Sequence, residues 1–474
     1  MTSTTSEPPK LQPSSYIPLM FALLTAVFAF QLNASMLSPA LATMEDELGA
    51  TTAQIGLTQT AFFTAAALFS LFLPRWGDLI GRRKVLVGMM AVAALGCVVS
   101  AIAPNAAVLL IGRIIQGVAG PTVPLCLIML RQQVLNEQQY ALLLGIVTSV
   151  NGGIAGVDAL AGGWLAGNFG YRSVFWTMAV LCAIAVVAVQ VFTKESTATE
   201  TPRMDWAGAL PLAVALGCVL TAFNEAGKLA EANWFLVIIL LLIGAAGFWA
   251  FWNVEKKVAD PLVPVAYLKQ RRTWALLSTT LLTMTGVFAV MNGLIPNLGQ
   301  DADAGAGISA STISWVTLTP YALAGLVFGP IAGWMASKLG YKYVLQTGLI
   351  GTVVGLIISI FVVGAPNAWT LLFVSIFLGV TYAGIANIML NGLGIVLSPA
   401  DNQGYLPGMN AGAFNLGAGL SFAVLFAVSG SFEHGYRAGM IAGVIILLAA
   451  LALSFRIPRP ESIDDTVAAV NARK

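Results

Sequence analysis

Long apolar runs alternate with short polar segments along nearly the whole chain. Each run is close to the roughly 20 residues that an α-helix needs to cross the hydrocarbon core of a membrane. Because a backbone in lipid must satisfy its own hydrogen bonds, runs this long and uniformly apolar favour helices over a barrel. The pattern predicts an all-α membrane protein with 14 transmembrane helices, near residues 16–38, 55–77, 85–104, 106–129, 141–165, 172–193, 206–223, 234–253, 273–296, 311–335, 343–364, 368–393, 406–429 and 437–455.

The lysines and arginines between the runs lie mainly in alternate connections. If the N-terminus is cytoplasmic, 19 of them fall on the cytoplasmic side and three on the other side, while Arg113 falls within a run. Cytoplasmic connections of membrane proteins are enriched in these residues. We therefore expect a multi-pass protein of the cell (cytoplasmic) membrane with both termini in the cytoplasm.

The composition narrows the class of protein further. Charged residues make up 9% of the chain and hydrophobic residues 58%, with a mean hydropathy of +0.85, which excludes an ordinary water-soluble globule. The net charge of +2 gives no indication of a nucleic-acid partner. The single histidine, His434, and the lack of a phosphate-binding Gly-Lys-Ser/Thr loop argue against an enzyme. We expect neither a metal nor a cofactor, because the cysteines all lie within apolar runs as packing residues: Cys97, Cys126, Cys182 and Cys218.

The connection after the second run carries a motif, Pro-Arg-Trp-Gly-Asp-Leu-Ile-Gly-Arg-Arg-Lys, from residue 74 to 84. Gly81 permits a tight turn, and an acid among cations can bridge to a neighbouring helix end. In the spacing of Asp78, Gly81, Arg82 and Arg83 the motif resembles the signature of the major facilitator superfamily, although a proline replaces its first glycine. The resemblance implies that these four residues form a conformational gate.

A weaker copy of this motif follows the tenth run, with Gly340 aligned on Gly81 and Ser337 where Asp78 stands. Such a faded repeat is expected of a transporter built from two homologous bundles. Two further stretches resemble motifs of the superfamily. Arg113 to Gly120 is similar to its Arg-x-x-Gln-Gly pattern, and residues 152–163 are similar to its glycine-rich antiporter motif, with Asp158-Ala159 in place of Gly-Pro.

Over nearly its whole length the chain resembles the fourteen-span drug/proton antiporter branch of the superfamily. The resemblance implies two six-helix bundles with two additional helices between them. It divides the chain into a disordered N-terminal lead (1–15), an N-terminal six-helix bundle (16–193), a cytoplasmic linker (194–205), two extra helices (206–253), a cytoplasmic interfacial loop (254–272), a C-terminal six-helix bundle (273–456) and a cytoplasmic tail (457–474).

Asp158 is the one carboxylate placed well inside a predicted span. An ionisable side chain at that depth costs about 2.5 to 3.5 kcal/mol, so a partner or a function is expected for it. Counting about 1.5 Å per residue from the span ends puts Arg113 and Asp158 both roughly 10 Å deep. We therefore predict that the two face each other and that Asp158 binds and releases a proton as water reaches the pair. A static ion pair that only orients the helices is the alternative.

Uncharged polar residues at similar depths predict a substrate cavity with scattered hydrogen-bonding groups. For any one of them, hydrogen bonding between helices is the alternative reading. The predicted cavity residues are Gln31, Asn33, Gln59, Gln116, Asn151, Met291, Asn292, Tyr382, Asn387, Asn391, Asn410 and Asn415.

A largely neutral lining suits a hydrophobic or amphipathic molecule better than a multiply charged one. Together with the resemblance, this predicts a monomeric secondary transporter that exports drug-like or lipid-like small molecules by alternating access, in exchange for protons and in contact with membrane lipids. Two alternatives remain open. One is a proton-coupled importer or facilitator of a neutral small molecule in the same fold, which is compatible with the altered Gly-Pro and with Asn33 where exporters often carry an aspartate. The other is a non-transporting receptor or a lipid scramblase.

Overall fold

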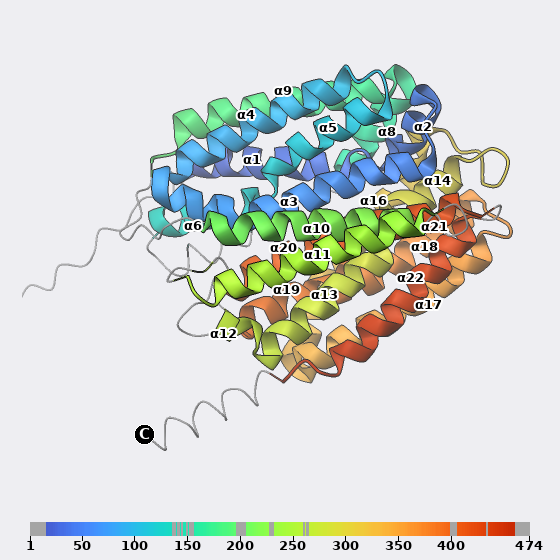
Figure 1. Ribbon diagram of the computed structural model, residues 1–474. Coiled ribbons are helices and arrows are strands. Elements are labelled where there is room, and N and C mark those ends of the chain that lie inside the picture. Colours follow the sequence, from blue (N-terminus) through green and yellow to red (C-terminus); the bar gives the residue numbers. More distant parts are fainter. Residues whose placement is uncertain are drawn as a thin grey trace, which may run out of the picture.

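The computed structural model describes residues 16–134, 156–195, 205–226, 232–258, 265–398, 405–432 and 435–459, and single residues between them. Every regular element in these residues is a helix. Figure 1 shows the helices running roughly side by side along one direction, with the N-terminal helices (blue) on one side and the C-terminal helices (orange to red) on the other.

The N-terminal half contains the elements between residues 17 and 192. Helix α4 packs on both α5 and α9, while α1 packs on α9 and α3 packs on α5. The elements of this half are α1 (Ile17–Ser35), η2 (Ser38–Ala40), α2 (Leu41–Leu48), α3 (Thr52–Ile80), α4 (Arg82–Ala101), α5 (Ala106–Gln116), η3 (Gly117–Ala119), α6 (Thr122–Gln133), α8 (Val157–Phe169) and α9 (Tyr171–Phe192).

The C-terminal half contains the elements between residues 271 and 454, with α13 packed on α20 and α22 and with α16 and α17 packed on η7. Its elements are α13 (Arg271–Ala289), η6 (Val290–Leu294), α14 (Ile295–Gln300), α15 (Ala310–Val316), α16 (Leu318–Leu339), α17 (Tyr341–Val362), α18 (Ala368–Leu378), η7 (Gly379–Ala386), α19 (Asn387–Val396), α20 (Tyr405–Ser421), η8 (Phe422–Phe426), α21 (Ala427–Gly430) and α22 (Gly435–Ser454).

Between the two halves in sequence lie α10 (Trp206–Ala226), α11 (Trp234–Glu255) and the short α12 (Val265–Leu268). Figure 1 shows α10 and α11 in green, between the blue and the orange helices. The pair packs mainly on itself, and α10 also contacts α3 and α20.

Twelve helical stretches among the described residues are long and apolar enough to cross a membrane. They coincide with 12 of the predicted spans. The predicted span 55–77 lies within α3, and 141–165 lies partly outside the described residues. The structure thus confirms an all-helical, multi-span protein but does not establish the predicted count of fourteen.

Two glycines end one helix and begin the next at equivalent places in the two halves. Gly81 joins α3 to α4 with a φ of 110°, and Gly340 joins α16 to α17 with a φ of 85°. A side chain at such a φ would strain the backbone, so glycine is the residue that allows this sharp turn. The alignment of Gly340 on Gly81 from sequence therefore corresponds to a shared backbone geometry.

The halves meet along α3 and α20, and at elements near one end of the molecule, which we call the α2 end because α2 lies there together with α14 (Figure 1). At the α2 end, helix α8 packs on α15, and η2 packs on η6 and α15. Hydrogen bonds that cross between the halves are Thr319 Oγ1 to the Gly156 carbonyl (2.7 Å), Ser314 Oγ to the Ala159 carbonyl (2.8 Å), Thr60 Oγ1 to the Gly419 carbonyl (3.0 Å), Asn297 Nδ2 to Glu45 Oε1 (3.2 Å), Gln300 Nε2 to the Pro39 carbonyl (3.2 Å) and Ser38 Oγ to Asn292 Oδ1 (3.5 Å).

Candidate functional site

Arg113, near the end of α5, is fully buried and forms the centre of a polar cluster in the N-terminal half. Its Nη1 atom donates to the side-chain oxygen of Gln116 at 2.6 Å and to the carbonyl of Asn33 at 3.2 Å. Its Nη2 atom donates to Gln59 Oε1 at 2.9 Å, and the guanidinium carbon lies 4.1 Å from the centroid of the Phe62 ring. A buried guanidinium needs such acceptors because an unpaired charge in this environment is very costly.

The cluster extends from α5 to α1 and α4. Gln116 Nε2 donates to Ser100 Oγ at 2.8 Å, and Cys97 Sγ donates to Asn33 Oδ1 at 3.3 Å. All four side chains are buried. Residues of α1, α3, α4 and α5 therefore form one hydrogen-bonded network, and the predicted cavity residues Asn33, Gln59 and Gln116 belong to it.

Asp158 lies in the first turn of α8 and is also buried, but its partner is not the predicted one. Its Oδ2 atom accepts a short hydrogen bond from Ser35 Oγ, and Gln31 Nε2 donates to the same hydroxyl at 3.1 Å. The hydrogen bonds of Arg113 go to Asn33, Gln59 and Gln116, so Arg113 and Asp158 are not paired in this structure.

Helix α1 nevertheless connects the two groups. Arg113 contacts it at Asn33, and Asp158 contacts it at Ser35, two residues further along. Two residues correspond to about 3 Å along a helix axis, so both groups approach α1 at nearly one level. The residues from Gln31 to Ser35 thus stand between the cation and the carboxylate.

Some buried polar atoms of this cluster have no hydrogen-bond partner within the described part of the chain. They are Gln59 Nε2, Arg113 Nε and Asp158 Oδ1. Buried donors and acceptors are usually satisfied, so these atoms indicate places where water or a bound molecule can attach. The two donors belong to the Arg113 network, and the acceptor lies on the other side of the α1 segment.

In the C-terminal half the predicted residues are spread over three spans. Asn410 accepts from Thr280 Oγ1 at 2.7 Å and donates to the Leu390 carbonyl at 3.1 Å, which joins α20 to α13 and α19. Tyr382 is buried, contacts Met284, and stacks on Tyr321 with ring centroids 6.4 Å apart.

Three π-helical segments interrupt helices of this half: η6, η7 and η8. Such segments widen the helix locally and are frequent at functional sites. Asn292 lies in η6 and Tyr382 in η7. Phe422 in η8 stacks on Phe63 of α3, with centroids 6.2 Å apart and planes within 8°, so aromatic rings line the contact between the halves.

The remaining predicted cavity residues are less clearly grouped. Met291 is fully buried, Asn415 is half-buried, and Asn387 bonds with Asn391, which is exposed. Asn151 lies outside the described residues.

The predicted gate residues lie around the Gly81 turn. Arg83 donates from its backbone nitrogen to Glu195 Oε1 at 3.0 Å and from its guanidinium to the Thr193 carbonyl at 3.3 Å, and Arg82 is buried. The side chain of Asp78 lies outside the described part of the chain. The described contacts of Arg83 thus join the turn to the segment that follows α9.

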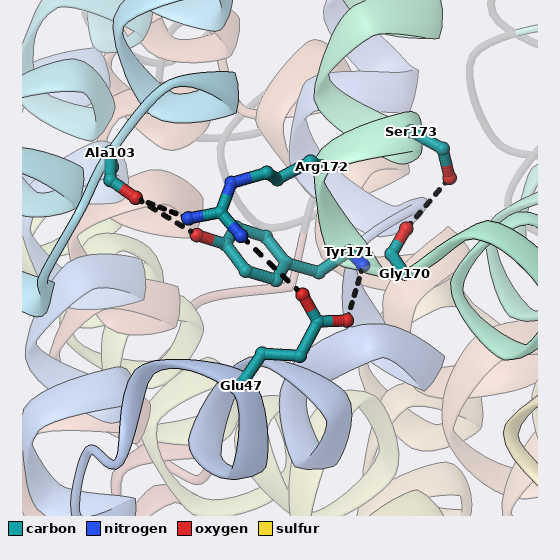
Figure 2. A network of polar contacts seen from close by, with 6 residues as sticks. All are labelled: Glu47, Ala103, Gly170, Tyr171, Arg172 and Ser173. Carbon is teal, nitrogen blue, oxygen red and sulfur yellow. Dashed lines mark hydrogen bonds and ion pairs between the residues drawn. The ribbon is translucent and has the colours of Figure 1, made fainter.

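Polar contacts at the α2 end were not predicted from the sequence, because the first span was expected to end at residue 38. Glu45 of α2 accepts from Thr52 Oγ1 at 3.0 Å as well as from Asn297. Figure 2 shows a second network there, in which Glu47 lies 3.6 Å from Arg172 and accepts from the Tyr171 backbone nitrogen at 3.2 Å. To predict the contacts of Glu45 and Glu47, the sequence would have had to be read as helical beyond residue 38.

Among the described residues, no group of three or more histidine, cysteine and acidic side chains could hold a metal ion. A body of apolar spanning helices in two halves, with buried polar side chains inside, is typical of membrane transport proteins. The chain belongs to the Major Facilitator Superfamily, whose model matches residues 23–302 and 276–471. It is accordingly a multi-pass membrane transporter and not an enzyme.

Two relatives differ in how closely they match the chain. The chain is 57% identical to the uridine/deoxyuridine transporter of Lactococcus lactis subsp. cremoris over 455 residues, which cover 94% of this chain and 95% of the relative. It is 24% identical to the multidrug resistance protein Stp of Mycobacterium tuberculosis, over 81% of this chain and 69% of that protein.

Solved structures agree in fold. A mutant of the nucleoside transporter NupG has a TM-score of 0.63 at 13% identity, covering 93% of this chain and 99% of that chain. The human organic anion transporter MFSD10 (TETRAN) has a TM-score of 0.62 at 14% identity, covering 94% and 100%. At these identities the similarity concerns the fold alone.

These comparisons correct two predictions. The superfamily is confirmed, but the drug/proton antiporter branch is not supported, because the relative that matches nearly the whole chain at 57% identity is a uridine/deoxyuridine transporter. The prediction of an exporter of drug-like or lipid-like molecules, with an amphipathic molecule as its partner, is wrong for the same reason. A neutral lining of amides and aromatic rings accommodates a hydrophilic, uncharged molecule as well as a drug, and the sequence reasoning did not separate the two.

Proposed function

We propose that the chain takes up uridine and deoxyuridine by alternating access. The observation that carries this proposal is the 57% identity to the uridine/deoxyuridine transporter over nearly the full length of both proteins. Asn33 and the Asp158-Ala159 pair, which depart from exporter motifs, support uptake as the direction.

The chemistry of the Arg113 cluster supports a nucleoside as substrate. Uracil has two carbonyl acceptors and one N–H donor on its edge, and the ribose adds hydroxyl groups. The unpartnered donors of Gln59 and Arg113 match the two carbonyl acceptors in type. Apart from Arg113, the hydrogen-bonding side chains of the cluster carry no charge, which suits a substrate that is neutral at physiological pH.

We also propose that Asp158 is the proton-binding group of the cycle, with Arg113 holding the α1 segment beside it. The bond from Ser35 and the contact of Arg113 with Asn33 support this, since a change at either group acts on the same turns of α1. Import with a proton is then driven by the membrane potential, about 2.3 kcal/mol per 100 mV for each charge moved.

The finer topology is part of the same proposal. We place fourteen spans in the cell membrane, with the bundles at 16–193 and 273–456, the extra pair at 206–253 and both termini in the cytoplasm. The distribution of lysines and arginines supports this orientation. In it, the α2 end faces the outside.

The test is uptake of radiolabelled uridine by cells that lack their own pyrimidine nucleoside transporters. We expect the chain to confer accumulation that excess deoxyuridine inhibits and that an uncoupler abolishes. Gln59→Met should weaken this uptake, whereas Gln346→Met, at another buried glutamine on α17, should not. Cells that accumulate no more uridine than the vector control, with the chain present in the membrane, would refute the proposal.

A further inference from the structure

The α10–α11 pair is loosely attached to the rest of the molecule. In the most apolar stretch of α11, only 17% of the residues are buried inside the protein. This is the smallest share among the 12 candidate spans. Helix α11 packs on α10, and α10 in turn packs on α3. A few apolar side chains between the pair and the halves, Leu212, Leu216 and Phe251, form a small cluster of their own, separate from the main core.

A cavity of about 270 Å³ lies beside this cluster. Helices of both halves and of the pair line it, with Ala67 from α3, Leu216 from α10, Phe251 from α11, Leu268 from α12, Leu281 from α13 and Gly412 from α20. Ser278 is the one lining side chain with a polar group. The cavity therefore suits an apolar occupant and gives water too few partners.

The space next to Gly412, on the α20 side of the cavity, is unfilled. A Cβ atom added there would meet no atom within 4 Å, although the residue lies in the middle of α20. Close-packed helices rarely leave such room, since interiors are packed as densely as organic crystals. In a bilayer, the apolar groups available to fill it are lipid chains.

The chain next to the cavity carries basic residues. Leu268 lines it, and the next residue, Lys269, is exposed. Segment 255–272 has five lysines and arginines against two carboxylates. Basic pockets between helices on the cytoplasmic side bind anionic head groups.

We propose that this cavity binds one acyl chain of an anionic phospholipid, with Lys269 at the phosphate of the head group. The lipid comes from the cytoplasmic leaflet in the orientation given above. It fills the space between the α10–α11 pair and both halves, so it is a structural ligand at their junction and is separate from the nucleoside site around Arg113.

The experiment measures lipid bound to the purified full-length chain by native mass spectrometry. The delipidated protein is offered phosphatidylglycerol or phosphatidylcholine with the same acyl chains. We expect one phosphatidylglycerol to remain bound and phosphatidylcholine to be retained several-fold less. Equal retention of the two lipids, or displacement of the lipid by uridine, would overturn the proposal.

Two matched pairs of variants locate the site. Gly412→Leu fills the cavity and should abolish retention, whereas Gly217→Leu, at an equally open position on α10 that does not line the cavity, should not. Lys269→Gln should lower the affinity for phosphatidylglycerol about fivefold. Lys84→Gln, at an exposed lysine on α4, should leave it unchanged.

A measurement on the unmodified chain keeps the proposal testable if Gly412→Leu does not fold. Phosphatidylglycerol with a photoreactive acyl chain should label peptides that contain Met409 or Leu277, which line the cavity. Labelling confined to the outward surface of α11, at residues such as Trp249, would show that no chain enters. Neither result depends on uridine transport, so failure of one proposal leaves the other intact.

Discussion

Asn297 Nδ2 donates a 3.2 Å hydrogen bond to Glu45 Oε1, which joins α14 of the C-terminal half to α2 of the N-terminal half. Glu47, two residues further along α2, pairs instead with Arg172 and the Tyr171 backbone of its own half (Figure 2). One short helix therefore carries a carboxylate that ties the halves together and another that does not. Of these two carboxylates, only Glu45 must give up a hydrogen bond to the other half when the halves separate at the α2 end.

We predict that Glu45→Ala shifts the protein toward the state that is open at the α2 end. A hydrogen bond contributes about 0.5 to 1.5 kcal/mol net, so its loss changes the ratio of states severalfold. The measurement is the rate at which a maleimide labels Ser38→Cys, a buried position in the same interface, in a chain that carries Cys218→Ser. In nanodiscs we expect labelling severalfold faster.

Glu47→Ala is the control for that measurement, because it removes a carboxylate from the same helix without touching the other half. We expect its labelling rate to stay close to that of the parent chain. Equal acceleration by both substitutions would mean that the effect comes from weakening α2 itself and not from the bond to Asn297.

The helices were predictable from sequence because the length of an apolar run is a local property. The turns at Gly81 and Gly340 were predictable as well. Glycine in a short connection permits a tight turn, and both residues have the positive φ that such a turn uses. The contacts of Arg113 were not. Counting residues from a span end gives the depth of a side chain, but each residue also turns the helix by about 100°, so the direction of the side chain depends on packing.

Two further features were beyond the sequence for different reasons. Glu45 follows a stretch that turns polar after residue 38, so α2 was expected to be part of a loop. The nature of the substrate was missed because residues such as Asn33 and Gln59 offer donors and acceptors that many neutral molecules can use. Only a relative of known substrate separated these possibilities.

Asp158→Asn tests the role proposed for the buried carboxylate. We expect uridine accumulation driven by a pH gradient to be lost, while exchange of internal for external uridine continues, because exchange requires no net proton movement. Both are measured in proteoliposomes with labelled uridine. Ser35→Ala, which removes the donor to Asp158 but keeps the carboxylate, should retain gradient-driven uptake. Undiminished accumulation by Asp158→Asn would exclude the carboxylate as the coupling group.

Arg113→Met tests whether the guanidinium holds the polar cluster together. The substitution leaves the Asn33 carbonyl and the oxygens of Gln59 and Gln116 without their donor. Each buried group left unpaired costs about 1 to 3 kcal/mol, so we expect a clear fall in the melting temperature of the purified protein. Arg172→Met, at a half-exposed arginine that bonds the Ala103 carbonyl, is the comparison and should lower it less. A larger effect at Arg172 would contradict the central role of Arg113.

Gly162→Ala tests how closely α8 approaches the end of α1. A Cβ at Gly162 would overlap the carbonyl oxygen of Met36, a backbone atom that cannot move alone, whereas a Cβ at Gly333 on α16 would meet nothing within 4 Å. Overpacking costs about 1 to 3 kcal/mol, while an alanine in an open helical position gains up to about 1 kcal/mol over glycine. We therefore expect Gly162→Ala to melt several degrees below the parent chain and Gly333→Ala to melt at or above it.

The same substitution should also affect transport, because α8 carries Asp158 as well as Gly162. We expect Gly162→Ala to impair uridine uptake even at a temperature where the protein is folded. Normal uptake at that temperature would show that the spacing between α1 and α8 is not critical.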